Sequence, residues 1–161
     1  MFAGVCFMRD EIIKLETDID DSTGEELGFV MELLFAAGAR DVRYLPVFMK
    51  KNRPAYQLQV ICDEKTMPAM EEIIFRETTS IGIRWQKMNR TVLEREFVQV
   101  ETPCGPVQVK VCRREGEVYC YPEYDSVAEI CRREGIPYRE LYRLAAALCE
   151  EQLKEKKQET A

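Results

Sequence analysis

Residues 12–34, IIKLETDIDDSTGEELGFVMELL, contain the change of period that decides the fold. In the first half, alternate residues are apolar or threonine, which is typical of a half-buried β-strand. The inward set is Ile13, Leu15, Thr17 and Ile19. In the second half, the apolar residues follow helical spacing. They are Leu27, Val30, Met31 and Leu34. The stretch therefore predicts a strand that runs directly into a helix.

Both ends of this helix carry local signals. Ser22 and Glu25 have the Ser-x-x-Glu spacing of a capping box, so the helix is expected to begin just after Ser22. Gly38 is expected to end it, because glycine tolerates the left-handed backbone that closes many helices.

Three further strands and a second helix are predicted in the first half of the chain. Segments 41–49 (DVRYLPVFM) and 55–62 (AYQLQVIC) alternate as strands, and Pro46 restricts the first of them to an edge or a bulge. Thr66 is expected to cap a helix that runs to about Glu77. The segment TTSIGIRWQ then predicts a hydroxyl-rich turn followed by a strand. The residues expected in that strand are Ile81, Ile83 and Trp85.

The predicted fold class is α+β. The order βαββαβ is the ferredoxin-like arrangement, in which two helices cover one face of an antiparallel sheet, and we assign it to a subdomain of residues 1–90. Residues 91–161 are predicted to form a second subdomain, a β-meander followed by two carboxy-terminal helices packed on it. Ser126, with Glu129, is expected to cap the first of these helices, and Gly135 to end it.

The last helix is expected to open at Pro137. Its predicted inward residues are Leu141, Leu144, Ala145 and Leu148. Cys112 and Cys120 flank a turn in the meander, where they are expected to face each other as packed thiols or, alternatively, as ligands of a soft metal.

Composition limits the classes of function. The net charge of -6 disfavours general nucleic-acid binding. The chain contains no histidine, so a metal site built by this chain alone needs carboxylate, thiolate or backbone ligands. The 7 cysteines are an odd number without a CxxC pair, which argues against a disulfide framework and a zinc ribbon. No apolar run is long enough to span a bilayer and no signal-peptide pattern is visible, so a cytoplasmic protein is expected.

An acidic cluster lies where the first strand meets the first helix. Alternation places Glu16, Asp18 and Asp20 on one strand face, with Asp21 and Glu25 at the helix start. Carboxylates this close either bind a hard cation or pair with lysines and arginines. Helix capping alone accounts for the helical half of the cluster, but it gives no reason for the three acids of the strand.

Basic and hydroxyl groups follow at two other places. The segment KKNRP concentrates Lys50, Lys51 and Arg53, which either hold a triphosphate or form a solvated hairpin. The segment ETTSIGIR offers hydroxyls, a glycine and Arg84, which either surround a phosphate or simply close a helix. In YPEYDS, Asp125 is again a possible cap.

Five separated segments share their order with a known family. They are LETDIDDSTGEELGFVMELLFAAGARDV, MKKNRPAYQLQVIC, ETTSIGIR, VETPCGPVQVKV and PEYDSVAEI. Together, from about Ile13 to about Ala147, they resemble the carboxy-terminal domain of the LarC family of nickel-insertion proteins. The resemblance implies a cyclometallase, of the lyase class, that inserts nickel into pyridinium-3,5-bisthiocarboxylic acid mononucleotide. The product is the nickel-pincer cofactor of lactate racemase-like enzymes, and CTP is consumed.

The resemblance also implies a binding site for CTP with Mn²⁺ or Mg²⁺. The residues that it places near the cation are Asp18, Asp20, Asp21 and Glu25. Those that it places near the nucleotide are Lys50, Lys51, Arg53, Glu77, Thr78, Thr79, Arg84, Glu123 and Asp125. Family members often have asparagine where Asp18 stands and methionine where Ser22 stands, so the acidic motif here is one charge richer. No catalytic nucleophile is identified.

The partners implied are an amino-terminal nickel-binding region, on the same or a separate chain, the mononucleotide substrate and further copies of the chain. Ni²⁺ is expected to be held by that amino-terminal region, because this chain lacks histidine. The alternative is a non-catalytic, oligomeric regulatory module of ferredoxin-like fold that binds a small ligand or nucleotide without turning it over.

Overall fold

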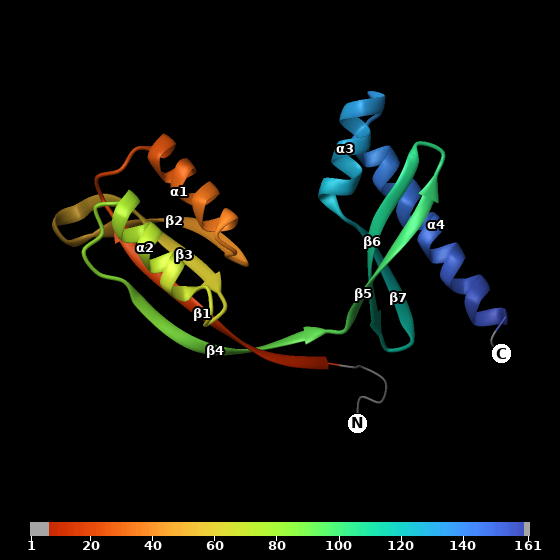
Figure 1. Cartoon of the computed structure of the whole chain (residues 1–161), viewed down its shortest axis with the longest axis horizontal. Coiled ribbons are helices and arrows are strands. Elements are labelled where there is room, and N and C mark those ends of the chain that lie inside the picture. Colours follow the sequence, from red (N-terminus) through yellow and green to blue (C-terminus); the bar gives the residue numbers. More distant parts are fainter. Residues whose placement is uncertain (1–6, 160–161) are drawn as a thin grey trace. The chain divides into compact units, whose positions relative to one another are not determined.

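The computed structural model describes residues 7–159, with side chains described up to residue 155 (Figure 1). The chain divides into two compact units, one formed by Arg9–Arg90 and the other by the residues from Thr91 onward together with those before Arg9. We call them the ferredoxin-like unit and the meander unit, and each is described by itself.

The ferredoxin-like unit has the predicted βαββαβ order. Its elements are β1 (Phe7–Ile19), α1 (Gly24–Ala36), β2 (Asp41–Met49), β3 (Arg53–Cys62), α2 (Met67–Glu77) and β4 (Arg84–Leu93), with a short 3-10 turn (Lys50–Asn52) between β2 and β3. The sheet order is β2-β3-β1-β4, so the expected topology is confirmed. Pro46 lies in the edge strand β2, as its missing amide requires.

Register explains why one face of this sheet is core. Leu15 of β1 pairs with Val60 of β3, which pairs in turn with Val42 of β2, and all three are buried. Helices α1 and α2 lie on one side of the sheet in Figure 1 and contribute Leu34 and Met70 to the same core. The opposite sheet face is left to the polar residues of the alternation.

The cap of α1 is one residue later than predicted. Thr23, not Ser22, is the N-cap, and Glu26 replaces Glu25 as its reciprocal partner. The Thr23 amide donates to Glu26 Oε2 at 2.6 Å, and the Glu26 amide donates to Thr23 Oγ1 at 3.2 Å. The sequence allows either position, because two adjacent hydroxyl residues are each followed by a glutamate three positions later. Gly38 has a positive φ of 97° just beyond the helix, as expected.

Two other expectations in this unit need correction. Thr66 is the N-cap of α2, but its hydroxyl bonds the backbone of Asp63 rather than a helix amide. The last strand begins only at Arg84, so Ile81 lies in the preceding loop and is 100% exposed, while Ile83 packs partly against the core. The alternation of apolar residues led to a predicted strand that started too early, because the conformation of the preceding loop is set by tertiary hydrogen bonds.

The meander unit is a three-stranded antiparallel sheet with two helices. Its elements are β5 (Arg95–Thr102), β6 (Gly105–Arg114), β7 (Glu117–Pro122), α3 (Tyr124–Glu134) and α4 (Tyr138–Glu159), and the sheet order is β5-β6-β7. The core joins valines of the sheet to residues of both helices. Its fully enclosed members include Val107, Val109, Val127, Leu141 and Ala145. The predicted meander and carboxy-terminal helices are therefore confirmed.

Three details of this unit differ from expectation. Ser126 lies inside α3, whose N-cap is Glu123, and the Ser126 hydroxyl accepts a hydrogen bond from the Gln108 amide at 2.9 Å. Leu144 is 39% exposed, whereas Cys149, one turn beyond Ala145, is buried. Helix α4 also runs to Glu159, well beyond Leu148, the last residue predicted for it. Gly135 ends α3 with a positive φ of 67°, as predicted.

Cys112 and Cys120 do not face each other. The register pairs Cys112 with Tyr119 and Val111 with Cys120, so the two thiols lie on opposite faces of the sheet. Cys120 is buried beside Cys149 of α4, and burial raises the pKa of its thiol to about 12. The expectation of a facing pair was wrong because the turn is tighter by one register step.

No helix within residues 7–159 is long and apolar enough to cross a membrane.

An ion-pair network outside the core predicts acid sensitivity. Asp10 accepts hydrogen bonds from Arg90 and Arg40, which lower its pKa to about 2. Because the folded pKa lies below the ordinary value of 3.8, the stabilisation exists above that value and is lost as pH falls through about 2. Asp10→Asn is therefore expected to lower the urea midpoint at pH 7 and to match the unsubstituted chain below pH 2. A difference that persisted at pH 1.5 would contradict the assignment.

Candidate functional site

A cavity of about 400 Å³ opens at one end of the four-stranded sheet. Its lining comes from the end of β1, the connection between β2 and β3, and the loop before β4. The lining residues are Thr17, Asp18, Asp20, Asp21, Met49, Lys50, Arg53, Thr79, Ser80, Ile81, Gly82 and Arg84. Three segments far apart in sequence thus meet around one space, all within the ferredoxin-like unit.

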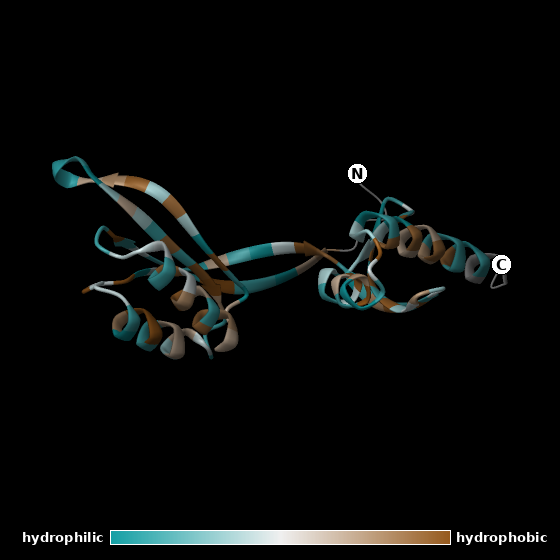
Figure 2. Ribbon diagram, turned by 90° about the horizontal axis from the view of Figure 1, so that it is seen from above, coloured by the Kyte–Doolittle hydropathy of each residue, from teal (hydrophilic) through white to brown (hydrophobic). Residues whose placement is uncertain are grey.

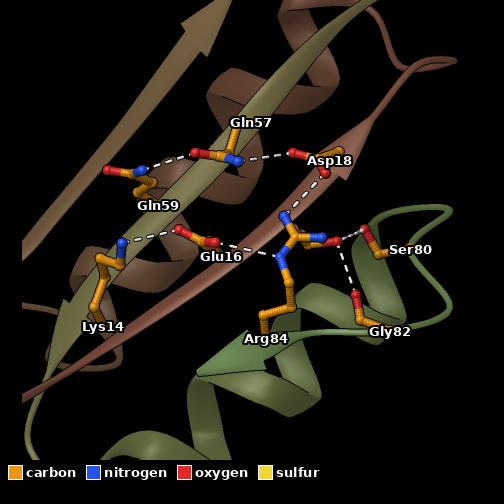
Figure 3. A network of polar contacts seen from close by, with 9 residues as sticks. Lys14, Glu16, Asp18, Gln57, Gln59, Ser80, Gly82 and Arg84 are labelled. Carbon is orange, nitrogen blue, oxygen red and sulfur yellow. Dashed lines mark hydrogen bonds and ion pairs between the residues drawn. The ribbon is translucent and has the colours of Figure 1, made fainter. Parts of the chain in front are cut away.

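Arg84 bridges two acids of the open sheet face (Figure 3). Its Nε lies 3.2 Å from Glu16 Oε1, and its Nη2 lies 2.9 Å from Asp18 Oδ2. Lys14 pairs with the other oxygen of Glu16 at 2.9 Å. Lys14 first, and then Arg84, lower the pKa of Glu16, while Asp18 and Glu16 raise the pKa of Arg84. Glu16 therefore stays ionised and the arginine stays charged.

The remaining carboxylates of the cavity are also paired. Arg53 Nη1 donates to Asp20 Oδ2 at 2.9 Å, which ties the start of β3 to the end of β1. The Thr79 hydroxyl donates to Asp21 Oδ1. The cavity thus contains three carboxylates, Asp18, Asp20 and Asp21, and three basic groups, Lys50, Arg53 and Arg84. Its formal charges balance.

A buried threonine fixes the loop that closes the cavity. Thr17 is 3% exposed, and its hydroxyl lies 2.9 Å from the Gly82 carbonyl oxygen and 3.0 Å from Ser80 Oγ. A hydroxyl has one proton, so Thr17 donates to Gly82 and accepts from Ser80. The Ser80 amide in turn donates to Thr78 Oγ1 at 3.1 Å. The loop position is therefore set by the core strand beneath it.

The basic turn between β2 and β3 forms the other wall. Lys51 and Asn52 both have positive φ, 61° and 56°, which tightens the connection. Lys50 lines the cavity, whereas Lys51 does not. Figure 2 shows this hairpin tip, at the far left of the view, as strongly hydrophilic.

The structure brings together seven of the residues expected at the site. They are Asp18, Asp20, Asp21, Lys50, Arg53, Thr79 and Arg84. Glu25 is exposed in the first turn of α1, outside the lining. Glu77 pairs with Arg76 at 2.6 Å, and the Thr78 hydroxyl donates to the Ile74 carbonyl at 2.6 Å, so both residues close α2.

Glu123 and Asp125 belong to the meander unit. Glu123 is the N-cap residue of α3 and pairs with Lys110 at 2.9 Å. Asp125 lies in the first turn of the same helix, where a carboxylate is favourable against the helix dipole. Within the described residues, no group of three or more Asp, Glu, Cys or His side chains is arranged to hold a metal ion directly.

Sequence reasoning missed two glutamines of the network. Gln57 Nε2 donates to Asp18 Oδ1 at 3.0 Å, and Gln59 Nε2 donates to Gln57 Oε1 at 2.8 Å. Their alternation with buried Leu58 and Val60 marked them as facing away from the core. Only the pairing of Asp18 with Gln57 across β1 and β3 showed which acid they meet.

Residues 4–142 match the model of a family described as nickel insertion protein. The chain belongs to this family. Over 128 residues it is 53% identical to the pyridinium-3,5-bisthiocarboxylic acid mononucleotide nickel insertion protein of Alkaliphilus metalliredigens, covering 80% of this chain and 30% of that protein. Its counterpart in Lactiplantibacillus plantarum is 41% identical over 146 residues, covering 91% and 34%. This nickel-insertion chain therefore spans about a third of the length of these relatives.

A solved structure agrees with this assignment. LarC2, described as the C-terminal domain of a cyclometallase involved in synthesis of the NPN cofactor of lactate racemase, in its apo form, superposes with a TM-score of 0.77. The match has 40% identity and covers 90% of this chain and 99% of that domain. The resemblance to the carboxy-terminal domain of the nickel-insertion family is confirmed, and so is the α+β fold.

Proposed function

We propose that this chain is the CTP-binding, carboxy-terminal part of a nickel cyclometallase. The full protein would insert nickel into pyridinium-3,5-bisthiocarboxylic acid mononucleotide, the compound in the names of its relatives. The observation that carries the nucleotide part of the proposal is the cavity in which Lys50, Arg53 and Arg84 meet carboxylates of β1. Basic groups that converge on one space suit a triphosphate.

The basic residues would neutralise the nucleotide. Arg53 and Arg84 offer planar guanidinium groups for bidentate phosphate binding, and Lys50 adds a point charge at the turn. The Thr79 hydroxyl also lines the cavity and can exchange its bond to Asp21 for one to a phosphate oxygen, whereas the Ser80 hydroxyl proton is used by Thr17. Together they would stabilise the negative charge that develops on a pyrophosphate leaving group.

The cavity acids are the ligand type that a hard divalent cation prefers, although the described residues are not by themselves arranged to hold one. The side-chain acids that line the cavity, Asp18, Asp20 and Asp21, supply oxygen ligands, which Mg²⁺ and Mn²⁺ prefer. Such an ion, when bound, neutralises and orients phosphate oxygens. Glu25 lies outside the lining and would reach the ion only through water or through rearrangement.

Nickel, as the substrate metal, is proposed to arrive from elsewhere in the protein. The chain has no histidine, and the curated relatives are about three times its length. We propose that an amino-terminal region, on the same or another polypeptide, holds Ni²⁺ and that the active protein is a homo-oligomer. Lys51, Glu77, Thr78, Glu123 and Asp125 lie outside this cavity, and they would contribute only through such an assembly.

A regulatory module that binds nucleotide without cleaving it is the second candidate. The paired, charge-balanced cavity is compatible with simple ligand sensing, since the fold itself does not set the chemistry. The two candidates separate on one measurement. Cleavage of CTP to CMP and pyrophosphate, once the nickel-bearing region is supplied, supports the cyclometallase, and intact CTP supports the sensor.

Calorimetric titration tests the nucleotide site first. We expect this chain to bind CTP in the presence of Mn²⁺ more tightly than ATP, and weakly without the metal. Absence of binding for both nucleotides, with Mn²⁺ present, would contradict a complete site in this chain.

Asp20→Asn gives a residue-level check. Loss of one carboxylate is expected to weaken Mn²⁺-dependent CTP binding by about tenfold, or ~1.4 kcal/mol, because a neutral amide is a poorer ligand for a hard cation. Asp41→Asn, at an exposed position that starts β2 outside the cavity, is the matched control. Equal affinities of the two variants in the same titration would remove Asp20 from the site.

A further inference from the structure

Arg84 holds two carboxylates, and each carboxylate has a second anchor (Figure 3). The guanidinium donates hydrogen bonds to Glu16 Oε1 at 3.2 Å and to Asp18 Oδ2 at 2.9 Å. Lys14 holds the other oxygen of Glu16 at 2.9 Å, and Gln57 holds the other oxygen of Asp18 at 3.0 Å. If Arg84 moved away, one oxygen of each acid would be released while both carboxylates stayed in place.

The exposures of these groups indicate which partner moves. The side chain of Arg84 is 56% exposed, whereas those of Glu16 and Asp18 are 23% and 24% exposed. The two acids project from β1, whose alternate residues are fixed in the core. Ion pairs to an exposed arginine are weak, so exchanging them for another partner costs little.

The charge balance of the cavity decides what that partner is. An isolated cation must compete with Arg53 and Arg84 for the acids, and an isolated polyphosphate must compete with the acids for the arginines. A cation already bound to a polyphosphate offers an opposite charge to both sets at once. Phosphate oxygens also attract guanidinium groups strongly and in bidentate geometry.

We propose that Arg84 couples binding of the triphosphate to binding of the divalent cation that accompanies it. When the triphosphate enters, Arg84 turns from Glu16 and Asp18 to the phosphates, and the released carboxylate oxygens face the accompanying cation. Cation and nucleotide therefore bind together and each binds poorly alone. The inference rests on the proposed function, and it adds Glu16, which lies beside the cavity, to the groups that respond to the ligand.

The coupling is measured with Mn²⁺ as the probe. Free Mn²⁺ is followed by electron paramagnetic resonance as the chain is added, without nucleotide and then with CTP, and the second series is referred to Mn²⁺ and CTP without the chain. We expect the unsubstituted chain to bind Mn²⁺ at least about tenfold more tightly when CTP is present. Arg84→Gln is expected to bind Mn²⁺ without nucleotide about tenfold more tightly than the unsubstituted chain, and to lose the enhancement by CTP.

Arg40→Gln is the matched control. Arg40 also bridges two carboxylates of the ferredoxin-like unit, Asp10 at 3.0 Å and Asp63 at 2.5 Å, but it lies outside the cavity. Its removal is expected to leave Mn²⁺ binding unchanged. A gain equal to that of Arg84→Gln would show that any unpaired acids attract the metal, and would overturn the proposal.

The role of Gln57 has its own readout. In the double variant Arg84→Gln, Gln57→Leu, Asp18 loses its remaining anchor, so the gained Mn²⁺ affinity is expected to fall back by several-fold. Thermal melts of each variant separate lost folding from lost binding. A double variant that is folded and keeps the full gain contradicts the positioning role of Gln57.

The outcomes distinguish this inference from the proposed function. If the unsubstituted chain does not bind CTP with Mn²⁺, the proposed nucleotide site fails, whatever Arg84→Gln does. If CTP binds but Mn²⁺ alone binds equally tightly, or if Arg84→Gln gains no Mn²⁺ affinity, the site stands and the coupling through Arg84 is wrong.

Discussion

Leu58→Ala is expected to destabilise the ferredoxin-like unit by about 2 to 5 kcal/mol. Leu58 is 0% exposed in β3, which lies between β2 and β1 in the sheet. It pairs with Thr17 on one side and Tyr44 on the other, so a cavity there touches two neighbouring strands. Close-packed surroundings on both sides leave little room for the site to collapse.

Trp85 offers a probe for this unit alone. It is the single tryptophan of the chain, at the start of β4, so its fluorescence during urea unfolding reports the ferredoxin-like unit. Leu45→Ala, at a position 37% exposed on edge strand β2, makes the same chemical change and is expected to cost only about 0.5 kcal/mol. A loss below 1 kcal/mol for Leu58→Ala would indicate that the core rearranges around β3.

Thr17→Val is expected to combine a stability loss with a loss of ligand binding. Valine keeps the shape of threonine but removes the hydroxyl that the Gly82 carbonyl and Ser80 share. Leaving a carbonyl without its partner costs about 1 to 3 kcal/mol. The loop then loses its tie to β1, and its Thr79 and Ser80 hydroxyls are no longer held at the cavity, so CTP affinity with Mn²⁺ is expected to fall at least about tenfold.

Thr17→Ser separates these effects. Serine retains the hydroxyl and loses one methyl group, so it is expected to bind CTP nearly as the unsubstituted chain does, with a stability loss of about 1 kcal/mol. Urea unfolding and calorimetric titration of both variants give the two readouts. If Thr17→Val binds CTP normally, the loop is ordered by other contacts and the hydroxyl serves stability only.

Local pattern predicted most of the architecture of the chain. The alternation of residues 13–19 and the helical spacing that follows it gave the first strand and helix, and the same logic gave the meander, because burial selects one face of each element. Two of the local misses are shifts by a single position. Thr23 rather than Ser22 caps α1, and Cys120 is one register step away from facing Cys112.

The candidate site divides in the same way. The sequence by itself determined its ingredients, namely acids on one face of β1, a basic turn and a hydroxyl-rich loop, since each of these depends on neighbouring residues only. The tertiary structure alone decided their partners. Arg84 meets Glu16 and Asp18, and Arg53 meets Asp20, through strand pairings of residues 33 to 68 positions apart.

Those partners could not be predicted, because the sequence around a charged residue does not indicate which distant residue it will pair with. Any arginine can neutralise any exposed carboxylate at similar, small free energy. The choice is made by the sheet register, which buried residues such as Leu15, Leu58 and Val60 fix through packing of the whole core. The sequence thus specified the chemistry available to this protein, and the packed sheet decided which charges stand together at the cavity.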